Sequence, residues 1–266
     1  MQPTFLPWMG YFGLIEQVDL FLLLDTVQFS KQSWQQRNSI SDASGERRYI
    51  TLPVSRKPSF PLLKAARIAS QQPYQERLQA QLHNSLGKMP HYALVERLFL
   101  EAVAAGQGYL ARLNLHFIRA VMELLGIKTP LMLMSDWLEQ QGWAEPDRPA
   151  KGIRKSSFLE AVCGRVQAAT YVSPPNAFAY LDEEKGFAES ATALRYFNYS
   201  PQPYPQPYLK SGFVSYLSIV DALACLGPEA SGACMRAGVR QLLTPEEIRQ
   251  SAQSNLPPYL LMRPKR

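Results

Sequence analysis

Residues 2–25, QPTFLPWMGYFGLIEQVDLFLLLD, place a rigid aromatic segment directly ahead of an apolar run. The spacing of Phe12, Ile15 and Val18 predicts a short helix over residues 6–17, and Pro7 suits its first turn, whose amides lack helical partners. Residues 20–24 are continuously apolar, as expected of a strand covered on both faces. We also expect a strand ahead of Gln2, so either that strand is very short or the natural start lies upstream.

The rest of the chain alternates between predicted strands and helices. Residues 34–40 and 47–54 flank the polar turn DASG and predict a β-hairpin. Further strands are predicted at 129–138, 169–175 and 193–200, with helices at 155–166 and 176–187. This order predicts an α/β class with a Rossmann-like, nucleotidylyltransferase-like and mostly parallel sheet, into which a helical subdomain is inserted.

We expect one composite domain in four parts. Residues 1–72 form a first α/β half with a basic hairpin, 73–127 the helical insertion, 128–243 the second α/β half, and 244–266 a C-terminal helix and tail. The proline-rich residues 201–208 must be a loop or arm. An apolar helix over 217–227 should end at Gly227, and Thr244 with Glu247 predicts a capping box.

Composition and charge restrict the class of protein. The chain has 266 residues, three cysteines and a net charge of +6, and no apolar run approaches the length of a membrane span. We therefore expect a cytoplasmic protein without a membrane span. Residues 31–67 carry the whole positive surplus, which suits phosphate-bearing partners or a solvated basic loop. The basic residues of this segment are Lys31, Arg37, Arg47, Arg48, Arg56, Lys57, Lys64 and Arg67.

Two segments predict a phosphate-binding crevice. At the first helix, Gly10 and the free amides of the first turn would let a phosphate approach, with Trp8 and Tyr11 beside it. In nucleotidylyltransferases an HxGH motif opens this helix, and here Trp8 and Tyr11 replace its histidines. The two aromatic residues are equally consistent with core packing.

The second segment, DTVQFSKQSWQQRN, spans residues 25–38. Asp25 and Gln28 follow the carboxyl end of the predicted strand, where open α/β sheets bind ligands. Lys31, Trp34 and Arg37 would add two cations and a stacking surface, with Asn38 next to them, although an ordinary polar surface turn has the same composition.

Two weaker candidates lie further along the chain. Ser173 ends a predicted strand and Asn176 opens the next helix, which suits a ligand site or a simple helix cap. The aromatic arm around residues 196–208 would line a sugar site or contact a second copy of the chain in a homodimer. The sequence predicts no metal site, and it contains no Walker loop, GxGxxG, HExxH or GxSxG motif.

The two N-terminal segments resemble the WbqC-like family, which is known mostly from bacterial gene clusters for surface polysaccharides. Its pattern QPxYLPWxGYF, then DxVQFxKxxWxxRN, is met from Gln2 to Phe12 and from Asp25 to Asn38, with Phe5 in place of the usual tyrosine. The likeness continues at Asn114, Ser135, Tyr180 to Asp182, Ser218 and Asp221. The loop SPPNAFA, ahead of Tyr180, departs from the serine-glycine pair of relatives.

The resemblance implies an enzyme that transfers an aminoacyl or acyl group to a nucleotide-linked amino sugar, with a nucleotide sugar or ATP and Mg²⁺ as ligands. In this hypothesis Lys31 and Arg37 hold phosphate, and Trp8 and Trp34 stack on a ring. Catalysis would then involve Asp25, Gln28 and Lys31. Ligand binding would extend to Gln2, Gly10, Tyr11, Asn38, Ser173, Asn176 and Tyr180.

Two alternatives remain open from the sequence. The first is nucleotidyl transfer with an altered motif. The second is a non-catalytic module that binds nucleotides or RNA through the basic segment and its aromatic residues.

Overall fold

The computed structural model describes the chain except for residues 43, 56–60, 70–72, 144–154, 208–211 and 254–266. The chain divides into two compact units. Unit 1 contains residues 1–143 and 201–238, and unit 2 contains residues 144–200 and 239–265. Each unit is described by itself.

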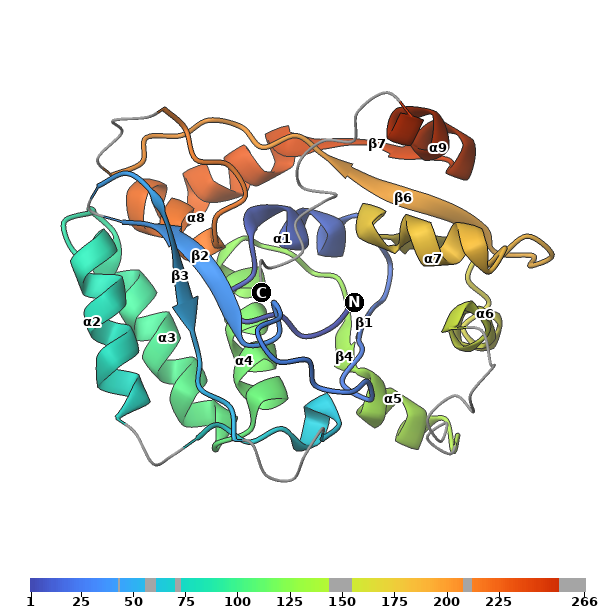
Figure 1. The fold of residues 1–266 in the computed structure, drawn as a ribbon, viewed down its shortest axis with the longest axis horizontal. Coiled ribbons are helices and arrows are strands. Elements are labelled where there is room, and N and C mark those ends of the chain that lie inside the picture. The colour runs from blue at the N-terminus through green and yellow to red at the C-terminus, as the bar shows by residue number, and fades with distance from the viewer. Residues whose placement is uncertain (43, 56–60, 70–72, 144–154, 208–211, 254–266) are drawn as a thin grey trace. The chain divides into compact units, whose positions relative to one another are not determined.

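Unit 1 combines a small parallel sheet, a hairpin and a set of helices (Figure 1). Strand β1 (Phe21–Leu23) pairs in parallel with β4 (Leu131–Leu133), and β2 (Arg37–Ser41) pairs antiparallel with β3 (Arg47–Thr51). Its helices are α1 (Met9–Glu16), η1 (Leu63–Ala65), α2 (Tyr74–Leu86), α3 (Tyr92–Gly106), α4 (Leu110–Leu124), α5 (Met134–Gln140) and α8 (Ile219–Gly238).

The helical segment 73–127 is part of the core of unit 1. Helices α3 and α4 pack against each other and α2 packs against α3 (Figure 1). Gly106 permits the close approach of α3 to α4, because a Cβ at this position would lie 2.8 Å from Cβ of Leu113. The apolar face of α4, which includes Leu113, Phe117 and Val121, is fully buried.

Unit 2 has a three-stranded sheet in the order β5–β6–β7. Strand β5 (Thr170–Ser173) is parallel to β6 (Ala193–Tyr199), which is antiparallel to β7 (Val239–Leu243). The described helices of the unit are α6 (Lys155–Arg165), η2 (Pro175–Ala177), α7 (Phe178–Glu183) and α9 (Pro245–Gln253). Helix α9 begins with the predicted capping box: Glu247 N donates to Thr244 Oγ1 (3.1 Å), and Thr244 N donates to Glu247 Oε2 (2.7 Å).

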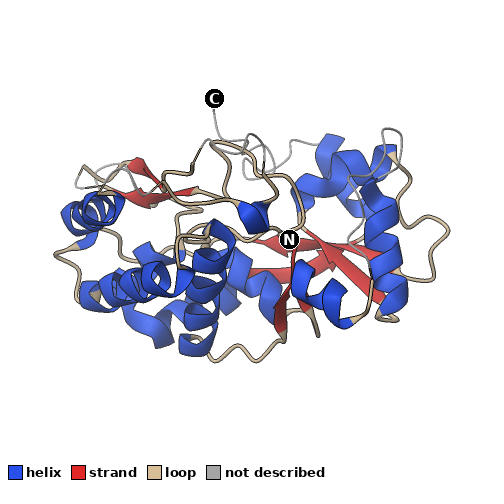
Figure 2. Ribbon diagram, turned by 90° about the horizontal axis from the view of Figure 1, so that it is seen from below, coloured by secondary structure: helices blue, strands red, loops and turns tan. Residues whose placement is uncertain are grey.

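The mixed α/β class is confirmed, but a Rossmann-like sheet is not. The described strands form three separate sheets, two of two strands and one of three. Unit 1 and unit 2 each contain one parallel and one antiparallel pair of strands. Figure 2 shows how short most strands are beside the helices. The expected strand 129–138 was wrong beyond Leu133, because Met134 begins α5.

The predicted end of a helix at Gly227 is confirmed, although the chain then becomes helical again. Gly227 has φ 75° and ψ 177°, which lies outside helical geometry, and Pro228 follows it inside α8. Proline suits the first turn of the new helix because its missing N–H would have no partner there. Helix α8 is therefore two helices joined at a kink.

Candidate binding site in unit 1

Backbone and amide hydrogen bonds join the two N-terminal motif segments. Phe5 N donates to Trp34 O (2.9 Å), and Asn38 Nδ2 donates to Phe5 O (3.1 Å). Nearby, Gln35 Nε2 donates to Gln2 Oε1 (2.9 Å). The two motif segments are therefore neighbours in space, although a helix and a strand separate them in the sequence. The predicted crevice requires this proximity.

Asn114 holds this pair of segments against α4. Its Nδ2 donates to Pro3 O (3.1 Å) and to Gln35 O (2.8 Å), and the residue is completely buried. Asn114 therefore binds one backbone carbonyl from each segment. A single side chain thus donates to one buried carbonyl of each segment.

The two aromatic site candidates of the opening motif contact other rings, and Tyr11 is buried whereas Trp8 is half-buried. Tyr11 is buried and its hydroxyl donates to Gln2 O (3.0 Å), while burial raises its pKa above the ordinary value. The Trp8 indole covers Gly10, where an added Cβ would lie 2.2 Å from the ring, and it contacts the Tyr216 ring at 5.4 Å between centroids. Gly10 is thus needed for close packing of Trp8, and phosphate binding at this helix end stays a prediction.

Asp25 lies at the carboxyl end of β1 but is fully buried. Its carboxylate accepts from Ser135 N (2.9 Å) and Ser135 Oγ (2.6 Å) at the start of α5. Desolvation raises the pKa of Asp25, with a smaller contribution from Asp136, although the bonds from Ser135 oppose the shift. The carboxylate connects β1 to α5, and its predicted catalytic role stays a prediction.

Trp34 and Arg37 of the second segment are half-buried and lie beside Tyr49 of the hairpin. The Arg37 guanidinium carbon is 4.5 Å from the centroid of the Tyr49 ring, and the Trp34 ring centroid is 6.3 Å from the same ring. Tyr49 is 41% exposed, and Gln28 and Lys31 are also exposed. We call Trp34, Arg37 and Tyr49 the hairpin surface. Such a surface can stack on a flat ring and attract an anion.

Tyr49 was not among the predicted site residues. The alternation of side chains along a strand would have placed Tyr49 on the exposed face of β3. Its neighbour Ile50 is buried, and adjacent residues of a strand point to opposite faces. In the hairpin register Tyr49 pairs with Ser39, so that Arg37 is its diagonal neighbour.

A second buried carboxylate, that of Asp221, is hydrogen-bonded to the end of β2 in the hairpin. It accepts from Ser41 N (2.9 Å), Ser41 Oγ (2.5 Å) and the Tyr204 hydroxyl (3.0 Å). Tyr204, which the sequence placed in an aromatic arm, therefore points inward. Arg47 adds another tie, because its guanidinium donates to Ser39 Oγ (2.7 Å) and Ser215 O (2.5 Å).

The stability of the fold should depend on pH through Asp221. Desolvation raises its pKa, so the native state holds the proton more tightly than the unfolded chain does. The stabilising contribution is complete below the unfolded pKa of about 3.9 and is lost as pH rises through the higher folded pKa. Asp221→Asn removes this loss, since the amide cannot ionise.

We therefore expect the free energy of unfolding of Asp221→Asn, relative to wild type, to increase between pH 4 and pH 7. Urea denaturation at several pH values measures it. Asp42→Asn is the matched control. Hydrogen bonds from Ser44 lower the pKa of Asp42, so its stabilising contribution is present above the unfolded pKa of about 3.9, and the difference from wild type should not rise between pH 4 and pH 7. A pH-independent difference for Asp221→Asn would contradict the assignment.

The three remaining predicted residues belong to unit 2. Ser173 is buried at the end of β5, and Asn176 is exposed within η2. The predicted cap was wrong: residue 177 occupies the cap position of α7, and no side chain caps that helix. Tyr180 lies on α7, where burial and Glu184 raise its pKa. Their roles in ligand binding stay predictions.

No group of three or more His, Cys, Asp or Glu side chains is arranged to hold a metal ion within the residues that are described. Over the same residues, every helix is too short or too polar to cross a membrane.

Comparison with known proteins identifies the family. The model of the WbqC-like protein family matches residues 2–232, which include both N-terminal segments, Asn114 and Asp221. The chain belongs to the WbqC-like protein family. Its similarity to the uncharacterized protein Rv1507c of Mycobacterium tuberculosis is 29% identity over 235 residues, which covers 86% of this chain and 94% of the relative. No solved structure is significantly similar to it.

Both N-terminal segments lie within the residues that the family model matches, and they are bonded directly to each other. Gln2 and Phe5 of one segment bond directly to Gln35, Trp34 and Asn38 of the other. A change in either segment would therefore leave buried polar groups of its partner unsatisfied.

Proposed function

We propose that the hairpin surface of unit 1 binds the nucleotide part of a nucleotide-linked amino sugar, to which the protein transfers an aminoacyl or acyl group. The observation that carries the proposal is the Arg37 guanidinium 4.5 Å from an exposed Tyr49 ring, with Trp34 beside it. A ring and a phosphate adjacent to each other are what a nucleotide presents.

The buried network beneath the hairpin favours this site. Asn114 binds the carbonyl of Gln35, next to Trp34, and Asn38 binds the carbonyl of Phe5 in the other segment. Asp221 accepts a hydrogen bond from Ser41 at the end of β2. A ligand would meet side chains whose backbone is already ordered, which lowers the entropy cost of binding. Exposed Lys31 adds positive charge to the same segment.

The transfer step forms an amide bond between the sugar nitrogen and the acyl carbon. The activating group leaves with the electron pair of the old acyl bond, and the nitrogen loses a proton. Activation of an amino acid by ATP and Mg²⁺ would supply such a donor. A role in the biosynthesis of bacterial surface polysaccharide is supported by the gene clusters in which the WbqC-like family mostly occurs.

Tyr49→Leu should weaken binding of UDP-glucosamine about tenfold, because loss of ring stacking and cation–π contact removes about 1–2 kcal/mol. Isothermal titration calorimetry measures the affinity. Tyr109→Leu is the matched control, since Arg67 lies 3.6 Å from the Tyr109 ring in another arginine–tyrosine pair of unit 1. Equal losses in both variants would contradict a site at the hairpin.

The reaction is tested by incubating the protein with nucleotide-linked amino sugars, amino acids, ATP and Mg²⁺. Mass spectrometry should detect the sugar nucleotide increased by one aminoacyl group. Release of pyrophosphate from a nucleoside triphosphate with transfer of its nucleotidyl group to a sugar phosphate would instead indicate nucleotidyl transfer. Tight binding of RNA that falls steeply with salt would indicate a nucleic-acid module.

A further inference from the structure

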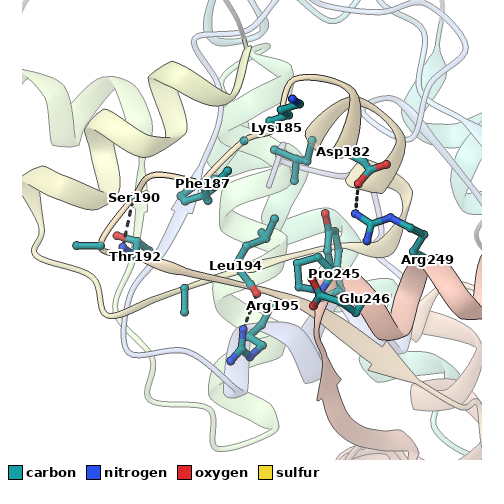
Figure 3. A pocket seen from close by; sticks show the side chains of 16 residues that line it. Asp182, Lys185, Phe187, Ser190, Thr192, Leu194, Arg195, Pro245, Glu246 and Arg249 are labelled. Atoms are coloured by element: carbon teal, nitrogen blue, oxygen red, sulfur yellow. Dashed lines mark hydrogen bonds and ion pairs between the residues drawn. The ribbon is translucent and has the colours of Figure 1, made fainter.

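A cavity of about 490 Å³ lies within unit 2, between the α7–β6 connection, β6 and the first turns of α9 (Figure 3). This volume is typical of sites for small molecules. The α9 wall, which includes Arg249, follows the last residue that the WbqC-like family model matches. Neither the proposed function nor the family match assigns a role to this cavity.

One wall of the cavity contains a lysine in a conformation that favours glycine. Helix α7 ends in a Schellman motif, in which Gly186 N donates to Leu181 O (2.8 Å) and Lys185 N donates to Asp182 O (3.2 Å). Lys185 is the left-handed residue of this motif, with φ 51°. Glycine would take this conformation without the steric cost of a Cβ, so the backbone gives no reason for a lysine.

The charges of the cavity favour an anionic ligand. Its lining contains three cationic side chains, of Lys185, Arg195 and Arg249, and two acidic ones, of Asp182 and Glu246. Arg249 Nη2 donates to Asp182 Oδ1 at 2.5 Å (Figure 3). A guanidinium has five N–H donors, so one bond to Asp182 leaves capacity for a phosphate oxygen. The acidic and hydroxyl side chains suit the hydroxyl groups of a polyol.

We propose that this cavity binds a small phosphomonoester of the sugar phosphate class, with Lys185 and Arg249 supplying the positive charge that attracts its phosphate. Lys185 offers a mobile point charge and Arg249 a planar set of donors, which together match a dianion. All the residues involved lie in unit 2, and the proposal does not rest on the site in unit 1.

The test uses the full chain and glucose 1-phosphate as the probe. Wild type should bind it, and Lys185→Gly should bind about tenfold more weakly, since a charge-assisted hydrogen bond is lost. The same variant should melt at a higher temperature without the probe, because glycine relieves the left-handed strain. Lys185→Gln, which retains the strain, should also lose affinity.

Gln167→Gly is a matched control. Gln167 is the left-handed residue of the Schellman motif that ends α6, with φ 53°, and it does not line the cavity. This variant should gain thermal stability and keep the wild-type affinity. If Gln167→Gly lost as much affinity for glucose 1-phosphate as Lys185→Gly, the loss would come from changing a helix end and not from the lysine charge. That result would overturn the proposal.

Two further probes define the ligand class. Glucose should bind far more weakly than glucose 1-phosphate, and so should glucuronate, which carries a carboxylate. Binding of glucuronate as tight as that of glucose 1-phosphate would overturn the phosphate assignment, and failure of wild type to bind glucose 1-phosphate would overturn the site. Tyr49→Leu should leave the affinity for glucose 1-phosphate unchanged, which separates this proposal from the function proposed for unit 1.

Discussion

Asn114→Leu is expected to lower the free energy of unfolding by about 4 kcal/mol, because each of two buried carbonyls would lose its donor at a cost of about 1–3 kcal/mol. The carbonyls are those of Pro3 and Gln35, which Asn114 Nδ2 binds at 3.1 and 2.8 Å. Leucine is close to asparagine in size, so that the loss of donors, rather than a cavity, dominates the change. Urea denaturation followed by circular dichroism measures the difference.

Asn176→Leu is the matched control for Asn114→Leu. Asn176 is an exposed asparagine of unit 2, where the same substitution should change the free energy of unfolding by less than about 0.5 kcal/mol. If Asn114→Leu were as stable as wild type, the two motif segments would not depend on this side chain.

Local sequence signals predicted much of the secondary structure. The hairpin, the helices of residues 73–126, the helix end at Gly227 and the capping box at Thr244 are confirmed. Each of these features depends on residues that are close together in the sequence. The signals are a polar turn, a glycine, or a side chain that caps its own helix. These signals are independent of the rest of the fold.

Strand pairing and side-chain burial were less predictable because they depend on distant residues. Asp25 has the sequence position of a ligand-binding residue, yet its carboxylate binds Ser135, 110 residues further on. The same bonds lie at the start of α5, and the strand expected over residues 129–138 is correspondingly limited to Leu131–Leu133. A single sequence cannot distinguish a carboxylate that faces a ligand from one that anchors a helix.

The proximity of the two motif segments was predictable from the sequence, whereas the roles of their side chains stay predictions. The two motif segments lie together, as expected, and Trp34 and Arg37 belong to the hairpin surface. Trp8 contacts Tyr216 and Tyr11 contacts Phe21, and their roles in ligand binding stay predictions. An aromatic side chain has the same sequence signature whether it stacks on a ligand or on another ring.

Gly227→Ala is expected to lower the free energy of unfolding by about 3 kcal/mol. With φ 75° and ψ 177°, Gly227 adopts a conformation that is essentially restricted to glycine, and a side chain there costs about 1–3 kcal/mol. An added Cβ would also lie 3.0 Å from the imidazole ring of His91. His91 is held in place by its backbone N, which donates to Ala224 O (3.0 Å). The two helices of α8 would therefore have to change their angle or displace His91.

Two variants separate these causes. Gly126→Ala introduces a Cβ at φ 71° with no atom within 4 Å, so that it reports left-handed strain alone and should cost about 1 kcal/mol. His91→Ala combined with Gly227→Ala removes the contact and should recover only part of the loss, because the backbone strain remains. Full recovery would show that the His91 ring, rather than the backbone angle, requires glycine. If Gly227→Ala matched wild type in urea denaturation, the kink would not be fixed by this residue at all.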